Sequence, residues 1–265
     1  MVNRWDDLVT AESYAEHVDR WRIYRELNHR LAAVALADAS VEGIRTMLDL
    51  GCGTGATLEA LLGSLPMSAD VLAIDSAQAM VDQGRLRLPD PRISWRVGRA
   101  EDLIGKYLSS FDLVTCGAAF WHFDQALHAP ILDALKPEGW LVFNVPVAQC
   151  SGESVSAHPI QAALADLLAA RRDRFPALHP RFDRLRFGRL CETKGRVCNW
   201  IPHRWEGPQG ALVDLLRIPA MAELVAPGLS RLALDELVEE AAARVDADQL
   251  VGVDWWVARV GSASR

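Results

Sequence analysis

Three glycines at alternate positions are the residues of this sequence best placed to bind a ligand through the backbone. Gly51, Gly53 and Gly55 follow an apolar run that contains Asp49. Glycine has no Cβ, so the chain can turn sharply with positive φ and present bare N–H groups to a ligand. A helix beginning at Ala56 would direct the positive end of its dipole to the same place. The pattern predicts the binding site of a nucleotide-type cofactor.

The spacing of these glycines excludes two other glycine-rich loops. A phosphate-binding P-loop needs a lysine after its last glycine, and no lysine follows here. The dinucleotide fingerprint needs a glycine three residues after Gly53, where Ala56 stands. Together with Asp49 inside the predicted strand, the spacing favours a ligand that carries a carboxylate and an ammonium group over a pyrophosphate.

A second acid, Asp75, stands where a ribose could be held. It ends the apolar run 70–75, which is typical of a buried parallel strand, and it lies 24 residues after Gly51. A carboxylate at the end of the second strand can accept hydrogen bonds from both hydroxyls of a ribose diol. The alternative is an N-cap for the helix beginning near Ala77, a role that Ser76 fills equally well.

Strands and helices alternate in the part of the chain that must position these residues. The expected strands are 46–51, 70–75, 93–98, 111–117 and 139–145, and the expected helices are 56–65, 77–87 and 124–136. This alternation predicts an α/β fold with a doubly wound, parallel sheet, whose ligands bind at the carboxyl ends of the strands.

Five short segments stand in a fixed order between residues 40 and 146. They read LDLGCGTG (48–55), AIDSAQAM (73–80), VGRAEDL (97–103), FDLVTCGAAFWHFD (111–124) and LKPEGWLVF (135–143). This set resembles the class I S-adenosylmethionine-dependent methyltransferases, nearest to the small-molecule, ubiquinone-biosynthesis-like (type 11) group. The resemblance implies a Rossmann-like, mostly parallel seven-stranded sheet with helical cap and insertions. It also implies S-adenosyl-L-methionine as cofactor and S-adenosyl-L-homocysteine as product.

The resemblance assigns one part of the cofactor to each motif. The glycine turn would hold the methionine part, Asp75 the ribose, Met80 the lower face of the adenine, and Ala100 with Glu101 the adenine edge. The cofactor-binding residues predicted in this way are Asp49, Gly51, Gly53, Gly55, Asp75, Ser76, Met80, Ala100, Glu101, Asp102 and Cys116.

One position departs from the family pattern. Many relatives have an Asp immediately before the alanine that contacts adenine, whereas this chain has Arg99. We therefore expect the adenine amino group to turn to Glu101 or Asp102. The alternative is that these acids only favour the first turn of a helix through its dipole.

His122 is the first candidate for a catalytic base. It lies beyond the fourth predicted strand, where the resemblance places the transferable methyl group and the acceptor. A sulfonium methyl group transfers by in-line displacement, so the protein must align the nucleophile, exclude water and remove any proton the nucleophile carries. An imidazole titrates near neutrality. The alternative is a histidine that only shapes the pocket, while Asp124 is expected to cap the next helix.

Aromatic residues and other histidines are candidates for acceptor contacts. Tyr14 and Trp21 recur at helical spacing in the region 10–38, although such residues more often belong to the core. Trp121, beside the candidate base, is another predicted substrate contact. Weaker candidates near prolines are His158, His179 and His203.

An arginine-rich segment could reveal the substrate class. Seven arginines and two acids lie between Arg171 and Arg189. Because guanidinium groups suit carboxylates and phosphates, Arg181 and Arg184 are predicted to contact an anionic substrate or an acidic carrier protein. The alternative is a solvated helix face.

Composition limits the remaining function classes. The 265 residues carry a net charge of −7, which argues against a nucleic-acid partner. No run is long enough to cross a membrane and no signal peptide is evident, so we expect a cytoplasmic protein with no membrane partner. Five cysteines without paired spacing suggest neither zinc nor disulfides, and we expect no metal. Whether the protein is a monomer or a homodimer is left open.

The second half of the chain loses the regular alternation. Strand-like residues 197–204, a helical segment 209–225, a helix near 233–245 and a last strand 249–260 are expected after it. We expect a single domain with a cap (1–40), a cofactor-binding core (41–146), two lid insertions (147–194 and 207–230) and two C-terminal parts of the sheet (195–206 and 231–265).

The function predicted from these residues and the resemblance is methyl transfer to an oxygen, nitrogen or carbon atom of a small molecule in specialised metabolism. Three alternatives stay open. The fold could bind the donor and catalyse a non-methylating reaction such as a cyclisation. It could have become a binding module without turnover. The acceptor could also be a protein or an RNA.

Overall fold

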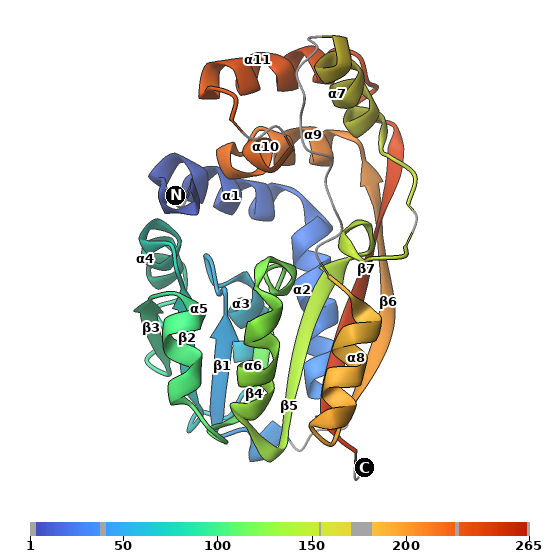
Figure 1. The fold of residues 1–265 in the computed structure, drawn as a ribbon. Coiled ribbons are helices and arrows are strands. Elements are labelled where there is room, and N and C mark those ends of the chain that lie inside the picture. Colours follow the sequence, from blue (N-terminus) through green and yellow to red (C-terminus); the bar gives the residue numbers. More distant parts are fainter. Residues whose placement is uncertain (1–3, 38–40, 154, 171–181, 226–227, 264–265) are drawn as a thin grey trace.

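A seven-stranded sheet forms the centre of the computed structural model, which describes residues 4–37, 41–153, 155–170, 182–225 and 228–263 (Figure 1). The strands are β1 (Thr46–Leu50), β2 (Asp70–Asp75), β3 (Ile93–Val97), β4 (Phe111–Cys116), β5 (Leu135–Pro146), β6 (Arg196–Pro208) and β7 (Leu250–Ser262). Their order is β3-β2-β1-β4-β5-β7-β6. The first five are parallel, and β7 is antiparallel to β5 and β6. The predicted fold class is therefore confirmed.

Helices flank this sheet and cover one end of it. The α-helices are α1 (Leu8–Arg20), α2 (Arg22–Leu36), α3 (Ala56–Leu62), α4 (Gln78–Arg87), α5 (Ala100–Leu103), α6 (His128–Asp133), α7 (Pro159–Ala170), α8 (Arg184–Thr193), α9 (Gly210–Leu216), α10 (Pro219–Val225) and α11 (Arg231–Ala242). Short 3-10 helices are η1 (Arg4–Asp6), η2 (Val41–Gly43), η3 (Ile104–Lys106), η4 (Phe120–His122), η5 (Gln125–Leu127) and η6 (Val147–Gln149).

The central strands are apolar because helices bury both of their faces. In β1, Met47 belongs to the core cluster shared with α2 and α3, whereas Leu48 and Leu50 belong to the cluster on the opposite face. All three side chains are fully buried. Alternate residues of a strand point to opposite faces, so a continuous apolar run is the pattern that a doubly covered strand needs. The carboxyl ends of these strands then meet at one edge of the sheet.

The N-terminal helical region is broken in the middle. Residues 10–38 were expected to be helical, and the structure has two helices separated at Trp21, whose backbone is extended (φ −107°, ψ 137°). The Trp21 indole N–H donates to the Asp214 carboxylate over 2.9 Å. The break lets α2 pack along the sheet while α1 lies across its upper end (Figure 1).

The last two strands are longer than their sequence suggests. They pair continuously from Arg196 opposite Ser262 to Pro208 opposite Leu250, and α9, α10 and α11 lie between them in the chain. These helices and α7 stand above the sheet in Figure 1. The expected helix 124–136 is also shorter, because β5 already begins at Leu135. Within the described residues, no helix combines the length and apolar character that crossing a membrane requires.

Candidate functional site

A cavity of about 560 Å³ lies where β1, β2, β3 and β4 end. This volume is within the usual range for a small-molecule site. The segments after these strands line it, together with η1, α1, α2, α10 and β7. Ten of the predicted site residues line it: Tyr14, Gly51, Gly53, Asp75, Ser76, Met80, Ala100, Glu101, Trp121 and His122.

The glycine turn after β1 has the backbone geometry that was expected. Gly51, Gly53 and Gly55 have φ of +65°, +51° and +83°. A Cβ on Gly51 would lie 2.6 Å from Cβ of Ala119, so this glycine also permits a close approach between two loops. Gly55 does not line the cavity. It begins α3, and a side chain there would meet Trp95 at 2.9 Å.

Asp75 connects the glycine turn to the helix that follows β2. Its Oδ2 accepts a hydrogen bond from the Gly53 N–H over 2.9 Å, and its Oδ1 accepts one from the Ala77 N–H over 2.9 Å. Burial raises the pKa of this carboxyl group, and the backbone donors of Ala77, Gly53 and Ser76 oppose that rise. The two carboxylate oxygens have about four acceptor positions together, so about one remains available to a hydroxyl group in the cavity.

Asp49 is a buried acid with one unsatisfied oxygen. Thr115 Oγ1 donates to its Oδ1 over 2.7 Å, whereas Oδ2 has no hydrogen-bond partner among the described residues. The side chain is fully buried and does not line the cavity. Burial raises the pKa of Asp49 to about 7. A carboxylate oxygen without a partner, in the strand that leads into the glycine turn, fits a ligand with a cationic group nearby.

Of the two acids in the segment after β3 that were candidates for the adenine edge, only one lines the cavity. Glu101 lines the cavity and Asp102 does not. Arg99, at the position that departs from the family pattern, also lines the cavity, and its guanidinium lies 3.3 Å from the Glu101 carboxylate. Met80 and Ala100 contribute apolar surface there. Cys116 is fully buried at the end of β4 and does not line the cavity.

The loop after β4 is held in an unusual conformation beside the cavity. Ala118 has φ of +56°, which side-chain-bearing residues seldom adopt. Its N–H donates to Oδ1 of the fully buried Asn144 over 2.8 Å. A Cβ on Gly117 would lie 2.2 Å from Thr57 Oγ1, so only glycine fits there. The hydrogen bond to Asn144 therefore fixes the loop that leads to Trp121 and His122.

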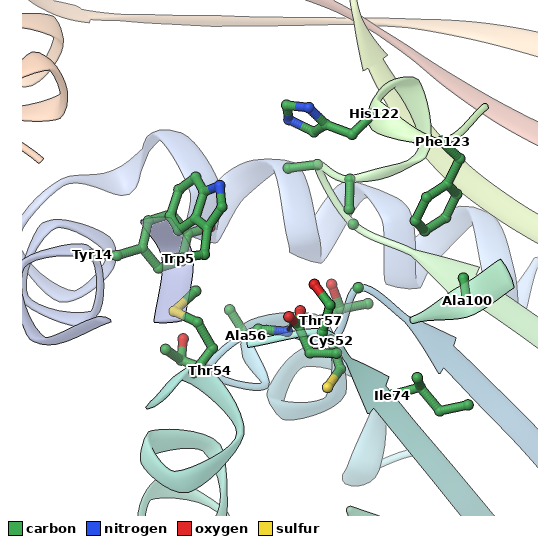
Figure 2. Close-up of a pocket in the computed structure, with 18 of the residues that line it drawn as sticks. Trp5, Tyr14, Cys52, Thr54, Ala56, Thr57, Ile74, Ala100, His122 and Phe123 are labelled. Atoms are coloured by element: carbon green, nitrogen blue, oxygen red, sulfur yellow. Dashed lines mark hydrogen bonds between the residues drawn. The ribbon is translucent and has the colours of Figure 1, made fainter. Parts of the chain in front are cut away.

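Aromatic residues from distant parts of the chain form much of the cavity wall. Figure 2 shows Trp5 and Tyr14 on one side and His122 and Phe123 on the other. Four further aromatic residues that the sequence did not indicate also line the cavity: Trp5, Tyr24, Phe123 and Trp255. The only sequence signal for them was their aromatic character, which core residues share.

Several other candidates lie away from the cavity. Arg184 pairs with Glu153, and its guanidinium stacks on the rings of Trp256 (3.8 Å) and Trp200 (4.7 Å). Neither Trp21, His158 nor His203 lines the cavity. Arg181 and His179 fall outside the described residues. Among the residues that the structure describes, no group of three or more His, Cys, Asp or Glu side chains could hold a metal ion.

The sheet order, the glycine turn after β1 and the acid at the end of β2 are the features that the resemblance to class I S-adenosylmethionine-dependent methyltransferases predicts. In agreement, residues 47–139 match the family model described as a methyltransferase domain. The residues present fit the cofactor of that class. Asp75 keeps acceptor capacity, Asp49 has an oxygen without a partner among the described residues, and the backbone of Gly51 and Gly53 lines the cavity.

Two known proteins with similar sequences are O-methyltransferases. The chain is 32% identical over 148 residues to a ubiquinone biosynthesis O-methyltransferase of Xanthomonas campestris, covering 54% of this chain and 56% of that protein. It is 31% identical over 150 residues to a malonyl-[acyl-carrier protein] O-methyltransferase of Priestia megaterium, covering 54% and 52%. The chain thus spans about half the length of the curated relatives it matches.

Solved structures share the fold at low sequence identity. One is a phosphoethanolamine N-methyltransferase 2 from Haemonchus contortus in complex with S-adenosyl-L-methionine, with a TM-score of 0.52 and 18% identity. The similarity covers 89% of this chain and 52% of that one. At this identity the likeness establishes the fold.

Proposed function

We propose that this protein transfers a methyl group from S-adenosyl-L-methionine to an oxygen atom of a small molecule. The observation that carries the proposal is a single cavity lined by the glycine turn, by Asp75 and by the loop with His122. The acceptor atom is proposed to be oxygen because the two curated relatives described above are O-methyltransferases. When bound, the cofactor supplies an electrophilic methyl group on a sulfonium centre.

The residues of this chain would have four tasks. Asp75 and the glycine turn bind the donor, because a carboxylate suits a diol and bare backbone N–H groups suit an anionic group. Trp5, Tyr14 and Met221 line the cavity on the side of the cap and lid helices and exclude water. The loop held by Asn144 orients the acceptor. His122 is proposed to accept the proton of the acceptor hydroxyl.

The setting of the reaction is also a proposal. All five cysteines are free thiols, which suits a reducing cytoplasm. We keep specialised metabolism as the proposed context and a monomer or homodimer as the proposed state. An anionic acceptor stays a hypothesis from the arginine-rich segment, and the pairing of Arg184 with Glu153 gives it no support. We expect Arg184→Ala to leave the Michaelis constant of the acceptor unchanged in steady-state assays.

The first experiment is a calorimetric titration of the protein with S-adenosyl-L-homocysteine. We expect one-to-one binding, weakened about 100-fold in Asp75→Ala, because hydrogen bonds to a charged group contribute about 1.5–3 kcal/mol each. Asp82→Ala is the matched control, since this exposed acid of α4 does not line the cavity. A folded protein that does not bind the ligand would overturn the proposal.

Turnover separates the methyltransferase from the alternatives. We expect S-adenosyl-L-homocysteine to accumulate with a methylated product, and an excess of chelator to leave the rate unchanged. Donor binding without accumulation would instead favour a non-methylating reaction or a binding module. Loss of turnover with the chelator, restored by a divalent ion, would contradict the metal-free proposal.

A further inference from the structure

The cavity has two sides with different chemistry. The glycine side consists of the segments after β1, β2 and β3, including Asp75 and Glu101. The other side, here called the aromatic side, is lined by Trp5, Tyr14, Tyr24, Trp121, His122 and Trp255. Figure 2 shows Trp5, Tyr14 and His122 above Cys52 and Thr54 of the glycine turn. The two sides come from different elements and meet where Trp5 and Tyr14 pack against the cluster that contains Met80.

Two sets of rings form the aromatic side. In the first, Trp5, Tyr14, Tyr24 and Trp255 make a continuous series with centroid separations of 5.6, 5.7 and 6.1 Å. In the second, the rings of Trp121 and His122 lie 3.6 Å apart. Figure 2 shows Trp5 and Tyr14 facing His122 across the cavity. Two such walls leave a space suited to another ring, because aromatic groups interact favourably by stacking or edge-to-face contact.

Permanent charge is confined to the glycine side. Among the described residues that line the cavity, the carboxylate and guanidinium groups belong to Asp75, Arg99 and Glu101, in the segments after β2 and β3. Arg99 is already paired with Glu101. An ionised acceptor on the aromatic side would lose hydration without gaining a permanent opposite charge from the residues of that side, which is unfavourable.

The aromatic side still offers neutral hydrogen-bond donors. Neither the Tyr14 nor the Tyr24 hydroxyl makes a hydrogen bond within the described part of the chain. Burial raises the pKa of both phenols well above the ordinary value, so both keep their protons. The indole N–H groups of Trp121 and Trp255 are buried and have no hydrogen-bond partner in the ranges of the chain that the structure describes. Neutral donors of this kind can hold a hydroxyl or carbonyl oxygen without requiring a charge.

We infer that the aromatic side binds a neutral, planar aromatic acceptor that carries a hydroxyl group. This inference rests on the proposed function, in which that hydroxyl is methylated. In the step, the oxygen–methyl bond forms as the methyl–sulfur bond breaks, and sulfur keeps the electron pair and becomes a neutral thioether. The hydroxyl proton passes to a base in the cavity, for which His122 is the candidate.

The binding test uses the full-length protein saturated with S-adenosyl-L-homocysteine and three probes. They are 2-naphthol, the anionic 2-naphthoate of similar shape, and the aliphatic dicarboxylate malonate. In calorimetric titrations we expect 2-naphthol to bind at least 10-fold more tightly than either anion. Equal or tighter binding of 2-naphthoate or malonate would overturn the inference.

Variants locate the binding to the aromatic side. We expect Tyr24→Leu to weaken 2-naphthol binding about 10-fold while the affinity for S-adenosyl-L-homocysteine changes less than 3-fold. Tyr107→Leu is the matched control, because Tyr107 packs against Phe111 outside the cavity. If Tyr24→Leu does not fold, Trp5→Leu replaces a less buried ring of the same wall. Unchanged 2-naphthol binding in the folded variants would also overturn the inference.

A turnover assay distinguishes failure of this inference from failure of the proposed function. Methylation of carboxylates, with no binding of 2-naphthol, would leave the proposed function intact and refute the aromatic acceptor. Selective binding of 2-naphthol that Tyr24→Leu weakens, with no methyl transfer to 2-naphthol or to any carboxylate or aliphatic hydroxyl compound tested, would support the aromatic site and refute the proposed function.

Discussion

Asp75 shows how one carboxylate can serve two roles that the sequence presents as alternatives. The sequence allowed either a cap for the next helix or a ligand for a ribose. In the structure, one oxygen accepts from Ala77 at the start of α4 and the other accepts from Gly53 in the glycine turn. With three backbone donors for about four acceptor positions, the carboxylate keeps some acceptor capacity. The hydrogen bonds that shape the turn therefore also aim the carboxylate into the cavity.

The burial of Asp49 makes stability depend on pH. Its pKa is about 7 in the folded protein, against an ordinary value of 3.8, so the folded state holds a proton that the unfolded state loses between these values. Stability from this group is complete below pH 3.8 and falls as pH rises toward 7. We expect the wild type to lose about 2 kcal/mol relative to Asp49→Asn between pH 5 and pH 7, measured by urea unfolding.

The comparison with the variant isolates this one group. His17 and His128 have lowered pKa values because they are buried, so they favour folding as pH rises, in both proteins alike. Asparagine can still accept the hydrogen bond from Thr115. Parallel pH profiles for the two proteins would show that Asp49 is ionised throughout, contrary to our expectation.

Site residues could be predicted from the sequence where one short segment carries both the turn and its chemistry. Gly51, Gly53 and Asp75 are of this kind, because glycine spacing and the acid after a strand are local features. Tyr24 and Trp255 could not be assigned to the cavity. They are far apart in the chain, and only the packing of α2 against β7 brings their rings to 6.1 Å. An aromatic residue at helical spacing looks the same whether it lines a cavity or the core.

Among the elements, the loops that meet at the cavity tolerate little change. Gly51 in the turn after β1 lies so close to Ala119 in the loop after β4 that a Cβ on Gly51 would be 2.6 Å from the Ala119 Cβ. Asn144 on β5 fixes Ala118 in the left-handed region. Residues of neighbouring strands thus hold the two loops in register, and the cavity depends on both.

We expect Gly51→Ala to abolish binding of S-adenosyl-L-homocysteine and to lower stability by about 1–3 kcal/mol. The new Cβ would clash with Ala119 at 2.6 Å, and alanine disfavours φ of +65°. Calorimetry and thermal unfolding measure the two effects. Gly63→Ala is the control, since φ there is −64° and no atom lies within 4 Å of the added Cβ. Wild-type affinity in Gly51→Ala would refute the close-approach argument.

The strands whose bounds could be predicted from the sequence are the short ones in the parallel part of the sheet. The strands β1, β2, β3 and β4 were predicted within one residue, because they are short runs bounded by turn residues. The ends of β6 and β7 were less clear, since β6 alternates irregularly between exposed and buried residues and contains Pro202. The break between α1 and α2 at Trp21 could not be predicted, because no glycine or proline stands near it in the sequence. It depends on the contact with Asp214, which lies 193 residues away.

On the scale of the whole molecule, ion pairs of Arg87 connect helix α1 of the N-terminal cap to helices that flank the sheet. It ends α4 and pairs with Asp19 of α1 at 2.7 Å and with Glu59 of α3 at 2.8 Å. Its side chain is 19% exposed, so solvent screens these contacts only in part. One residue therefore joins three helices, one of which carries Tyr14 into the cavity.

We expect Arg87→Met to lower the free energy of unfolding by about 1–2 kcal/mol, because two carboxylates lose a partly buried partner. Arg85→Met is the matched control. Arg85 pairs only with Asp82 of its own helix among the acids, is 45% exposed, and should change stability by less than about 0.5 kcal/mol. Urea unfolding measures both variants, and equal effects would show that Arg87 does not join the cap to the domain.

The way β6 and β7 pair also bears on how such a protein could change its substrate during evolution. Pro208 lies opposite Leu250, and Gln209 N–H donates to the Gln249 carbonyl over 2.8 Å, so both ends of the segment 209–249 are neighbours. This segment contributes Met221 to the cavity, whereas the glycine side comes from elements before it. Because its two ends are adjacent, the segment 209–249 could be replaced by a segment of another length without changing how β6 pairs with β7. A new segment would have to replace the hydrogen bonds that Ala211 makes with His17 and Asp214 with Trp21. Every residue of the glycine turn would stay in place.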